Sequence, residues 1–304
     1  RSGAGLDAQK QERLREINKQ LSTLTIEFGN HVLADNNDYL LVVDKKEDLA
    51  GLPEAVIEGA AHEAKAHGKD GKWVFTLQES GRTPLLQYAQ NRELRKNIYQ
   101  AYTSLGNRGN ANDNKDVLKQ VLALRLEKAQ LMGFSNYAEY QLSDNMAKTP
   151  QNALDLLYGL WKYSIKNAEA EAAELQKIMD REGKGEKLEA WDWWYYAEKL
   201  RQEKYSLNED EIKPYFSQED VFNGLCMVVN KLYGITLTPC DSISVYNKDV
   251  KTYIVKDADG SLLGVFYSDY MPRASKRSGA WMSNFREEQE GVRPLIYNVA
   301  SFTK

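Results

Sequence analysis

Apolar residues recur at steps of three and four along several long segments, and this spacing constrains the fold more than any other feature of the chain. In the first such segment, the apolar positions are Leu14, Ile17, Leu21, Leu24 and Phe28. Residues three and four apart lie on one face of an α-helix. We therefore expect a long first helix that begins after the polar residues near Asp7 and packs by one side.

Four further helices are predicted from the same spacing and from residues typical of helix ends. Glycine favours the end of a helix, proline is tolerated at its first position, and serine caps its start. The four segments run from Asn114 to Gly133, from Pro150 to Asp180, over residues 191–201, and from Ser217 to Tyr233. Most of the first two thirds of the chain is thus predicted to be helical.

The pattern changes after Thr236, where two hairpins are predicted. Residues 250–255 and 262–267 flank the turn sequence DADG, and residues 276–285 and 293–302 flank a charged turn. The predicted fold is mainly α, with a helical body and a small antiparallel or mixed β-sheet in the C-terminal third. We expect a helical domain at 1–212 and a domain of helix and sheet at 213–304.

Composition excludes some classes of protein. The net charge of −4 comes from interspersed acidic and basic residues without a basic stripe, which argues against nucleic acid as a partner. No apolar run approaches the roughly 20 residues that span a bilayer, so no membrane partner is expected. Cys226 and Cys240 lack the spacing of a disulfide framework or a thiolate metal site. These features favour a cytoplasmic protein.

One motif resembles a zinc site but has the wrong spacing. The sequence HEAKAH places His62 and His67 five residues apart, whereas two zinc-binding histidines on a helix are usually four apart. Five residues turn a helix by about 140° beyond a full turn, and four by about 40°. The two rings would therefore point in different directions. His31 is interpreted as a surface or capping residue, and no metal-binding or catalytic residue is assigned.

Three other segments contain residues of the kinds that ligand sites use. The DADG turn lacks the spacing of a calcium loop and is interpreted as a hairpin turn. Lys276 and Arg277 could bind a carboxylate or phosphate, although a solvated loop is the commoner outcome for such a pair. The aromatic residues at 191–196 could line a groove, but at this spacing they more often pack between helices.

Ten short blocks in order resemble the thimet oligopeptidase family of zinc metallopeptidases. The blocks extend over nearly the whole chain, and within the family they are closest to the bacterial peptidyl-dipeptidase (dipeptidyl carboxypeptidase) branch, with oligopeptidase A as the alternative. They are AGLP at 50–53, GKWVF at 71–75, NREL at 91–94, NYAEY at 136–140, MAKTP at 146–150, WDWWYYAEKLR at 191–201, KPYF at 213–216, LYGI at 232–235, KRSGAWM at 276–282 and PLIYNV at 294–299.

This resemblance implies a two-lobed helical peptidase with a deep channel for short peptides. It also implies a zinc ion held by an HExxH helix, which in the family follows the segment ending here at Phe302. The chain is accordingly expected to be an internal fragment without its own zinc or catalytic activity. Two alternatives stay open, an oligopeptidase A-like endopeptidase fragment and a non-catalytic helical module that binds peptides.

The resemblance assigns one candidate site to residues that are present. Gly279, Ala280 and Trp281 match the strand edge that pairs with the backbone of the peptide substrate. The competing interpretation is that the small residues only allow the strand to turn into the sheet. If the fragment exposes apolar surface, it is also expected to form dimers.

Overall fold

The chain forms two compact units in a computed structural model that describes residues 3–183, 185–206, 209–277 and 279–302. The first unit comprises Arg1–Leu200 and the second comprises Arg201–Lys304. The predicted division into domains at residue 212 stays a prediction, because compactness does not establish which segments fold independently.

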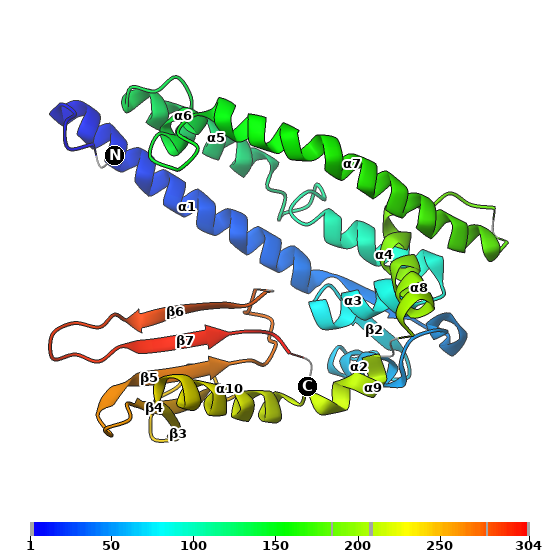
Figure 1. The fold of residues 1–304 in the computed structure, drawn as a ribbon. Helices are drawn as coiled ribbons and strands as arrows, with labels where there is room; N and C mark the ends of the chain where they lie inside the picture. Colours follow the sequence, from blue (N-terminus) through cyan, green and yellow to red (C-terminus); the bar gives the residue numbers. More distant parts are fainter. Residues whose placement is uncertain (1–2, 184, 207–208, 278, 303–304) are drawn as a thin grey trace. The chain divides into compact units, whose positions relative to one another are not determined.

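The first unit consists mainly of helices (Figure 1). Its α-helices are α1 (Ala8–Asp38), α2 (Glu54–Ala66), α3 (Glu79–Tyr88), α4 (Arg92–Thr103), α5 (Lys115–Leu131), α6 (Tyr137–Leu142), α7 (Pro150–Arg181) and α8 (Trp193–Tyr205), the last of which runs on into the second unit. Two short 3₁₀ helices, η1 (Lys46–Leu49) and η2 (Ala190–Asp192), precede α2 and α8.

The predicted first helix is confirmed as α1, and its apolar stripe explains its packing. The Asp7 side chain accepts a hydrogen bond from the Lys10 backbone and caps the helix start. Leu24 packs with Val117 and Val121 of α5, as the spacing of apolar residues on both helices requires. The first predicted helix and the helix predicted between Asn114 and Gly133 therefore lie against each other through one apolar seam.

Two helix ends carry the residues that the sequence predicts there, whereas the helix predicted over residues 191–201 is a 3₁₀ turn at Ala190–Asp192 followed by α8 up to Tyr205. Thr149 caps α7 by accepting a hydrogen bond from the Asn152 backbone, with Pro150 at the first helical position. Gly133 follows α5 with a φ of 84°, a left-handed conformation that glycine adopts without steric cost. These local signals depend only on neighbouring residues, which is why they are readable before the fold is known.

A two-stranded sheet in the first unit was not predicted. β1 (Leu40–Val43) pairs antiparallel with β2 (Trp73–Thr76). Phe75 belongs to the largest apolar cluster described, together with Leu49, Leu77, Leu85 and other buried residues of the first hundred. Each strand has only four residues, too few for an alternating pattern to stand out.

The second unit combines helices with a five-stranded mixed sheet (Figure 1). Its elements are α9 (Glu209–Ile212), η3 (Lys213–Tyr215), α10 (Gln218–Tyr233), β3 (Thr236–Pro239), β4 (Lys251–Lys256), β5 (Leu262–Asp269), β6 (Trp281–Arg286) and β7 (Leu295–Val299). The strand order is β3-β4-β5-β7-β6, and only β5 and β7 run parallel. The predicted fold class, mainly helical with a small sheet in the C-terminal third, is confirmed.

Both predicted hairpins are present in this sheet. Gly260 has a φ of 86° in the turn between β4 and β5, and the Asp259 carboxylate accepts a hydrogen bond from the Ser261 backbone. Phe222 of α10 stacks on Tyr253 of β4 at a centroid distance of 4.7 Å, so α10 packs on one face of the sheet. The DADG sequence thus serves as a hairpin turn.

Candidate functional site

Strand β6 forms one edge of the five-stranded sheet. It pairs with β7 on one side, and no strand of the described part of the unit pairs with its other side. All six of its residues are exposed, as are Gly279 and Ala280 just before it. A strand with a free edge presents unpaired backbone N–H and C=O groups, to which another extended chain can hydrogen-bond. The three predicted substrate-binding residues therefore lie at the start of an open edge.

Gly279 is required here by its backbone conformation. Its φ is 103°, and apart from Gly279 itself and its two neighbours in the chain, no heavy atom of the described residues lies within 4 Å of the position that a Cβ atom would occupy. A larger residue would be strained by the backbone angle and not by crowding. Gly279 lies two positions before Trp281, where β6 begins.

Aromatic side chains gather on the sheet beside β6. Phe285 stacks on Tyr297 at a centroid distance of 4.6 Å and contacts Tyr267 and Tyr246 edge-on at 5.5 and 5.8 Å. Phe285 remains 55% exposed and Trp281 39% exposed. The strand edge is thus flanked by partly exposed aromatic surface, which suits the side chains of a bound peptide.

The loop between β5 and β6 is held by the buried side chain of Lys276. Its Nζ atom donates to the Asp269 carboxylate at 2.7 Å and to the backbone oxygens of Asp269, Met271 and Ala300 at 2.9, 2.6 and 2.8 Å. Its side chain is only 2% exposed. The sequence favours a solvated loop at Lys276, with binding of a ligand carboxylate or phosphate as the alternative; Lys276 is instead buried, and its donors are used on the Asp269 carboxylate and on backbone oxygens of the chain itself.

Asp269 is the centre of this polar cluster. Besides Lys276, its carboxylate accepts two hydrogen bonds from Arg273 at 2.8 Å and one from the Tyr246 hydroxyl at 2.9 Å. Burial raises the pKa of Asp269, but the hydrogen bonds from Arg273, Lys276 and Tyr246 outweigh it and hold the pKa at about 2. Burial and the bond to this carboxylate raise the pKa of Tyr246 to about 12. Asp269 is therefore a structural anion that stays ionised.

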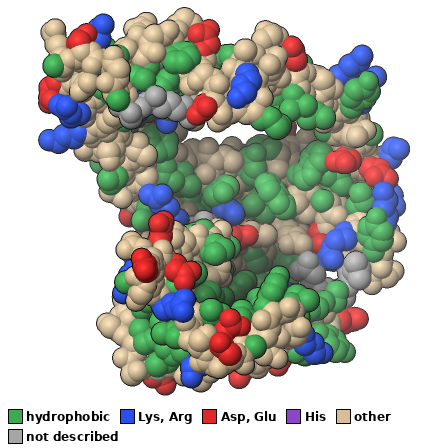
Figure 2. Space-filling view, turned by 60° about the vertical axis from the view of Figure 1, so that its left-hand side comes forward, with side chains coloured by type: hydrophobic (Ala, Val, Ile, Leu, Met, Phe, Trp, Pro, Cys, Tyr) green, Lys and Arg blue, Asp and Glu red, His purple; other side chains and the backbone are tan. Residues whose placement is uncertain are grey.

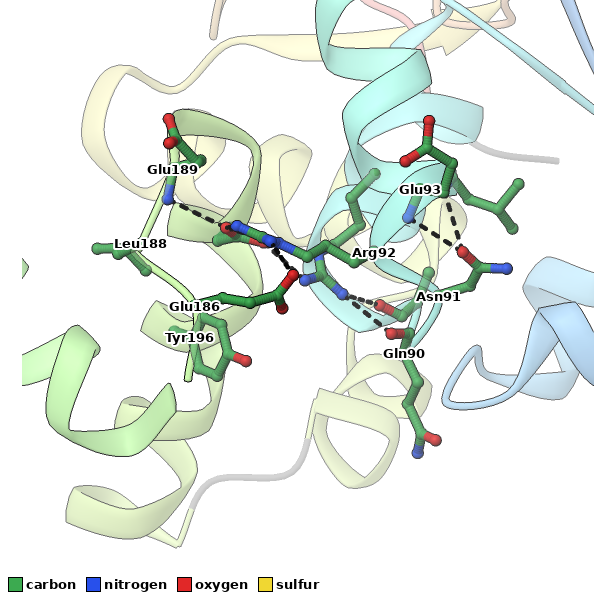
Figure 3. A network of polar contacts seen from close by, with 12 residues as sticks. Gln90, Asn91, Arg92, Glu93, Glu186, Leu188, Glu189 and Tyr196 are labelled. Carbon is green, nitrogen blue, oxygen red and sulfur yellow. Dashed lines mark hydrogen bonds and ion pairs between the residues drawn. The ribbon is translucent and has the colours of Figure 1, made fainter. Parts of the chain in front are cut away.

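A second buried carboxylate joins α4 to the start of α8 in the first unit. Arg92 and Arg95 both bind Asp192, at 2.7 and 2.8 Å. Arg92 also pairs with Glu186 at 2.7 Å (Figure 3). Burial raises the pKa of Asp192, yet the hydrogen bonds from the two arginines leave it lowered. No sequence motif marked this cluster, because its members are about 100 residues apart.

The aromatic cluster at 191–196 packs mainly as core. Tyr195 and Tyr196 are buried against Leu175, Ile178 and Met179 of α7. Trp194 differs from them, since it is 43% exposed. The preferred interpretation of packing between helices is therefore confirmed for the two tyrosines.

The three histidines do not converge. His67 follows the end of α2, and its Nε2 atom lies 3.1 Å from the Glu63 carboxylate, while His62 is exposed on the helix. The Nδ1 atom of His31 lies 2.9 Å from the Asn114 side chain, which joins α1 to the start of α5. Within the described residues, no group of three or more His, Cys, Asp or Glu side chains could hold a metal ion.

Comparison with known proteins identifies the family. Residues 85–304 match peptidase family M3, and this chain belongs to that family. It is 36% identical to the dipeptidyl carboxypeptidase of Salmonella typhimurium and 37% identical to the oligopeptidase A of Escherichia coli, with the whole chain aligned in both cases. The mitochondrial intermediate peptidase of Yarrowia lipolytica is 28% identical over 91% of the chain. The resemblance to metallopeptidases is thereby confirmed.

The chain spans less than half the length of these relatives, 45% of the dipeptidyl carboxypeptidase and 46% of the oligopeptidase A. Family M3 is a metallopeptidase family, in general zinc-dependent. The described residues of this chain do not fit such an ion, because they contain no suitable cluster and Glu63 is engaged by His67. No chemical step through a metal can be derived from them.

Two surface properties complete the description. On the face drawn in Figure 2, acidic and basic side chains are interspersed and do not separate by sign. In the described portion of the chain, no helix has both the length and the apolar character needed to cross a membrane.

Proposed function

We propose that this chain is the peptide-holding portion of an M3 metallopeptidase that releases C-terminal dipeptides from short peptides. The observation that carries the proposal is the free edge of β6, entered through Gly279 and Ala280, in a chain of this family. A peptide would add to the sheet as a further strand beside β6. Trp281 and Phe285 would contact its side chains.

An edge strand suits a peptidase that must accept many sequences. Backbone hydrogen bonds hold an extended peptide whatever its side chains are, while flanking pockets supply the preference for particular residues. The exposed residues of β6 leave this edge accessible within the second unit. The proposed site therefore selects unstructured peptides, since a folded segment has its own backbone groups already paired.

We further propose that zinc and the residues acting on the scissile bond belong to sequence outside this chain in a longer protein. The absence of a fitting cluster among the described residues supports this. The alternative activity is that of an oligopeptidase A-like endopeptidase, because relatives with both names are equally similar. Product analysis separates them: dipeptides alone support the first activity, and internal cleavage supports the second.

A non-catalytic peptide-binding module is the remaining alternative. It would share the edge strand but show no hydrolysis in any longer form of the protein.

We also propose a cytoplasmic location, supported by the unpaired Cys226 and Cys240. We further propose that the chain self-associates through exposed apolar residues such as Leu157 and Trp161 of α7. Light scattering during gel filtration measures the molar mass of the chain in solution and thus tests the self-association.

Backbone-modified peptides test the edge directly. In a β-ladder, alternate residues of a strand direct their N–H groups to the same neighbour. A peptide N-methylated at one set of alternate residues should therefore lose binding to this chain, whereas one methylated at the other set should keep it. Isothermal titration calorimetry with both peptides and the unmodified parent provides the measurement. Equal binding of all three would exclude pairing with an edge strand.

A further inference from the structure

The ammonium group of Lys276 lies where three segments of the second unit meet. Its four acceptors come from the end of β5, from the loop that follows, and from Ala300 just after β7. The Asp269 backbone oxygen that it contacts also accepts the Ala300 N–H at 2.9 Å. One cation thus joins the ends of the two parallel strands to the loop leading to β6.

A buried ammonium group is unusual, because the free energy of its lost hydration must be replaced by contacts within the protein. Removing a charge from water is costly unless the charge is paired and hydrogen-bonded. Lys276 satisfies this condition with one carboxylate oxygen and three backbone oxygens, while Arg273 binds the same carboxylate from the partly exposed side. The arrangement fixes the position of Lys276 relative to both strands.

The position of Lys276 in the sequence connects this anchor to the candidate site. Lys276 lies three positions before Gly279 and five positions before Trp281, where β6 begins. Ala280 and Gly279 are exposed, and apart from Gly279 and its two neighbours in the chain, no heavy atom of the described residues lies within 4 Å of the position a Cβ atom would take on Gly279. The contacts that hold the segment leading into β6 therefore come from Lys276, which precedes Gly279 in the sequence.

We propose that Lys276 is a positioning residue for the peptide-binding edge. Its buried ammonium holds the loop after β5 against the ends of β5 and β7, and thereby sets how the chain enters β6 through Gly279 and Ala280. This inference rests on the proposed function for the role of the edge. The anchoring of the loop can be measured without any peptide.

Chemical rescue distinguishes the ammonium from the rest of the side chain. Lys276→Ala leaves the four oxygens facing a space that n-propylammonium can fill, because this ion replaces the Cγ, Cδ, Cε and Nζ atoms. The neutral 1-propanol has nearly the same shape without the charge. Arg277→Ala is the matched control, since it removes the same charge from an exposed neighbour.

Hydrogen exchange of the 304-residue chain provides the first readout. In Lys276→Ala, the backbone amides of residues 281–286 that pair with β7 should exchange about tenfold faster, because the loop and the start of β6 can open locally, while those of β4 stay slow. Added n-propylammonium should restore slow exchange, and 1-propanol should not. Arg277→Ala should exchange like the wild type.

Calorimetry with the unmodified peptide provides the second readout. We expect about a tenfold loss of affinity in Lys276→Ala, corresponding to about 1.4 kcal/mol, with recovery in n-propylammonium. Unchanged exchange of the β6 amides that pair with β7, or equal acceleration in β4 and β6, would overturn the positioning role. If the wild type binds no peptide while the exchange pattern appears as expected, the proposed function fails and the anchoring by Lys276 stands.

Discussion

Asp192 and Asp269 are buried carboxylates that each bind two basic side chains. Asp192 holds Arg92 and Arg95, and Asp269 holds Arg273 and Lys276. Arg95 also stacks on the Tyr195 ring, with its guanidinium carbon 4.1 Å from the ring centroid. Pairing makes burial of these charges tolerable, and it makes the loss of one partner severe.

Replacing Asp192 tests this for the first unit. In Asp192→Ala, Arg95 would stay buried without a counter-charge, and we expect the unfolding free energy to fall by about 3–5 kcal/mol. Urea unfolding followed by circular dichroism measures the change. The control is Asp116→Ala, whose ion pair with Lys119 is largely exposed, and which should lose less than about 1 kcal/mol. Similar losses in both variants would contradict a special role for the buried cluster.

Asp269 predicts how the stability of the second unit depends on pH. Its folded-state pKa is about 2, below the value of about 4 expected in the unfolded chain. A lowered pKa contributes stability that is complete above about pH 4 and is lost as the pH falls through about 2. The contribution is about 2 kcal/mol. Asp269→Asn should therefore be less stable than the wild type at pH 6, with the difference shrinking towards pH 2. If the two proteins differ in unfolding free energy by the same amount from pH 6 to pH 2, the folded state does not favour the ionised form of Asp269.

Among the helices and strands, those with long periodic patterns were predictable. The stripe of Leu14, Ile17 and Leu24 and the caps Asp7 and Thr149 specify α1 and α7 locally. The strands β1 and β2 were missed because each has four residues and is recognisable only once paired. A helix or strand can be predicted from the sequence when it is long enough for its apolar spacing to repeat several times.

Gly279 offers a prediction for the entry to β6. Its φ of 103° makes Gly279→Ala strained, and we expect a loss of about 1–2 kcal/mol in the second unit. The matched control is Gly59→Ala within α2, where nothing lies within 4 Å of the added Cβ atom and helix propensity predicts a gain of about 0.5–1 kcal/mol. Thermal unfolding of both variants measures the difference. A neutral Gly279→Ala would mean that this turn can relax.

For the molecule as a whole, family membership indicates a metal-dependent peptidase, whereas the described residues of the chain indicate a site for binding an extended peptide. The chain belongs to a metallopeptidase family, yet its described residues offer an open strand edge and no metal cluster. Binding of substrate and the chemistry of cleavage therefore fall on different segments in our proposal. This division makes the 304-residue chain useful for measuring peptide binding without turnover.

Elemental analysis tests that division. After dialysis, the chain should retain much less than one equivalent of zinc and should not hydrolyse a blocked tripeptide or tetrapeptide. The reason is that His62 and His67 point in different directions and His67 contacts Glu63, so the two histidines cannot bind one zinc ion together. The buffer after dialysis is the blank. A full equivalent of bound zinc would reveal a site we have missed, and His62→Ala and His67→Ala would then be the first variants to make.

Local patterns and ordered motifs were enough to establish the helical body, the two hairpins and the family. They worked because caps, turns and apolar spacing act between residues that are close in sequence. The ion clusters of Asp192 and Asp269, and the burial of Lys276, emerged only from the folded chain. Arg95 and Asp192 are 97 residues apart, and the four acceptors of Lys276 come from three segments, so no local pattern could announce them. Whether a charged residue is a solvated loop residue or a buried anchor depends on which distant groups surround it, and this is set by packing.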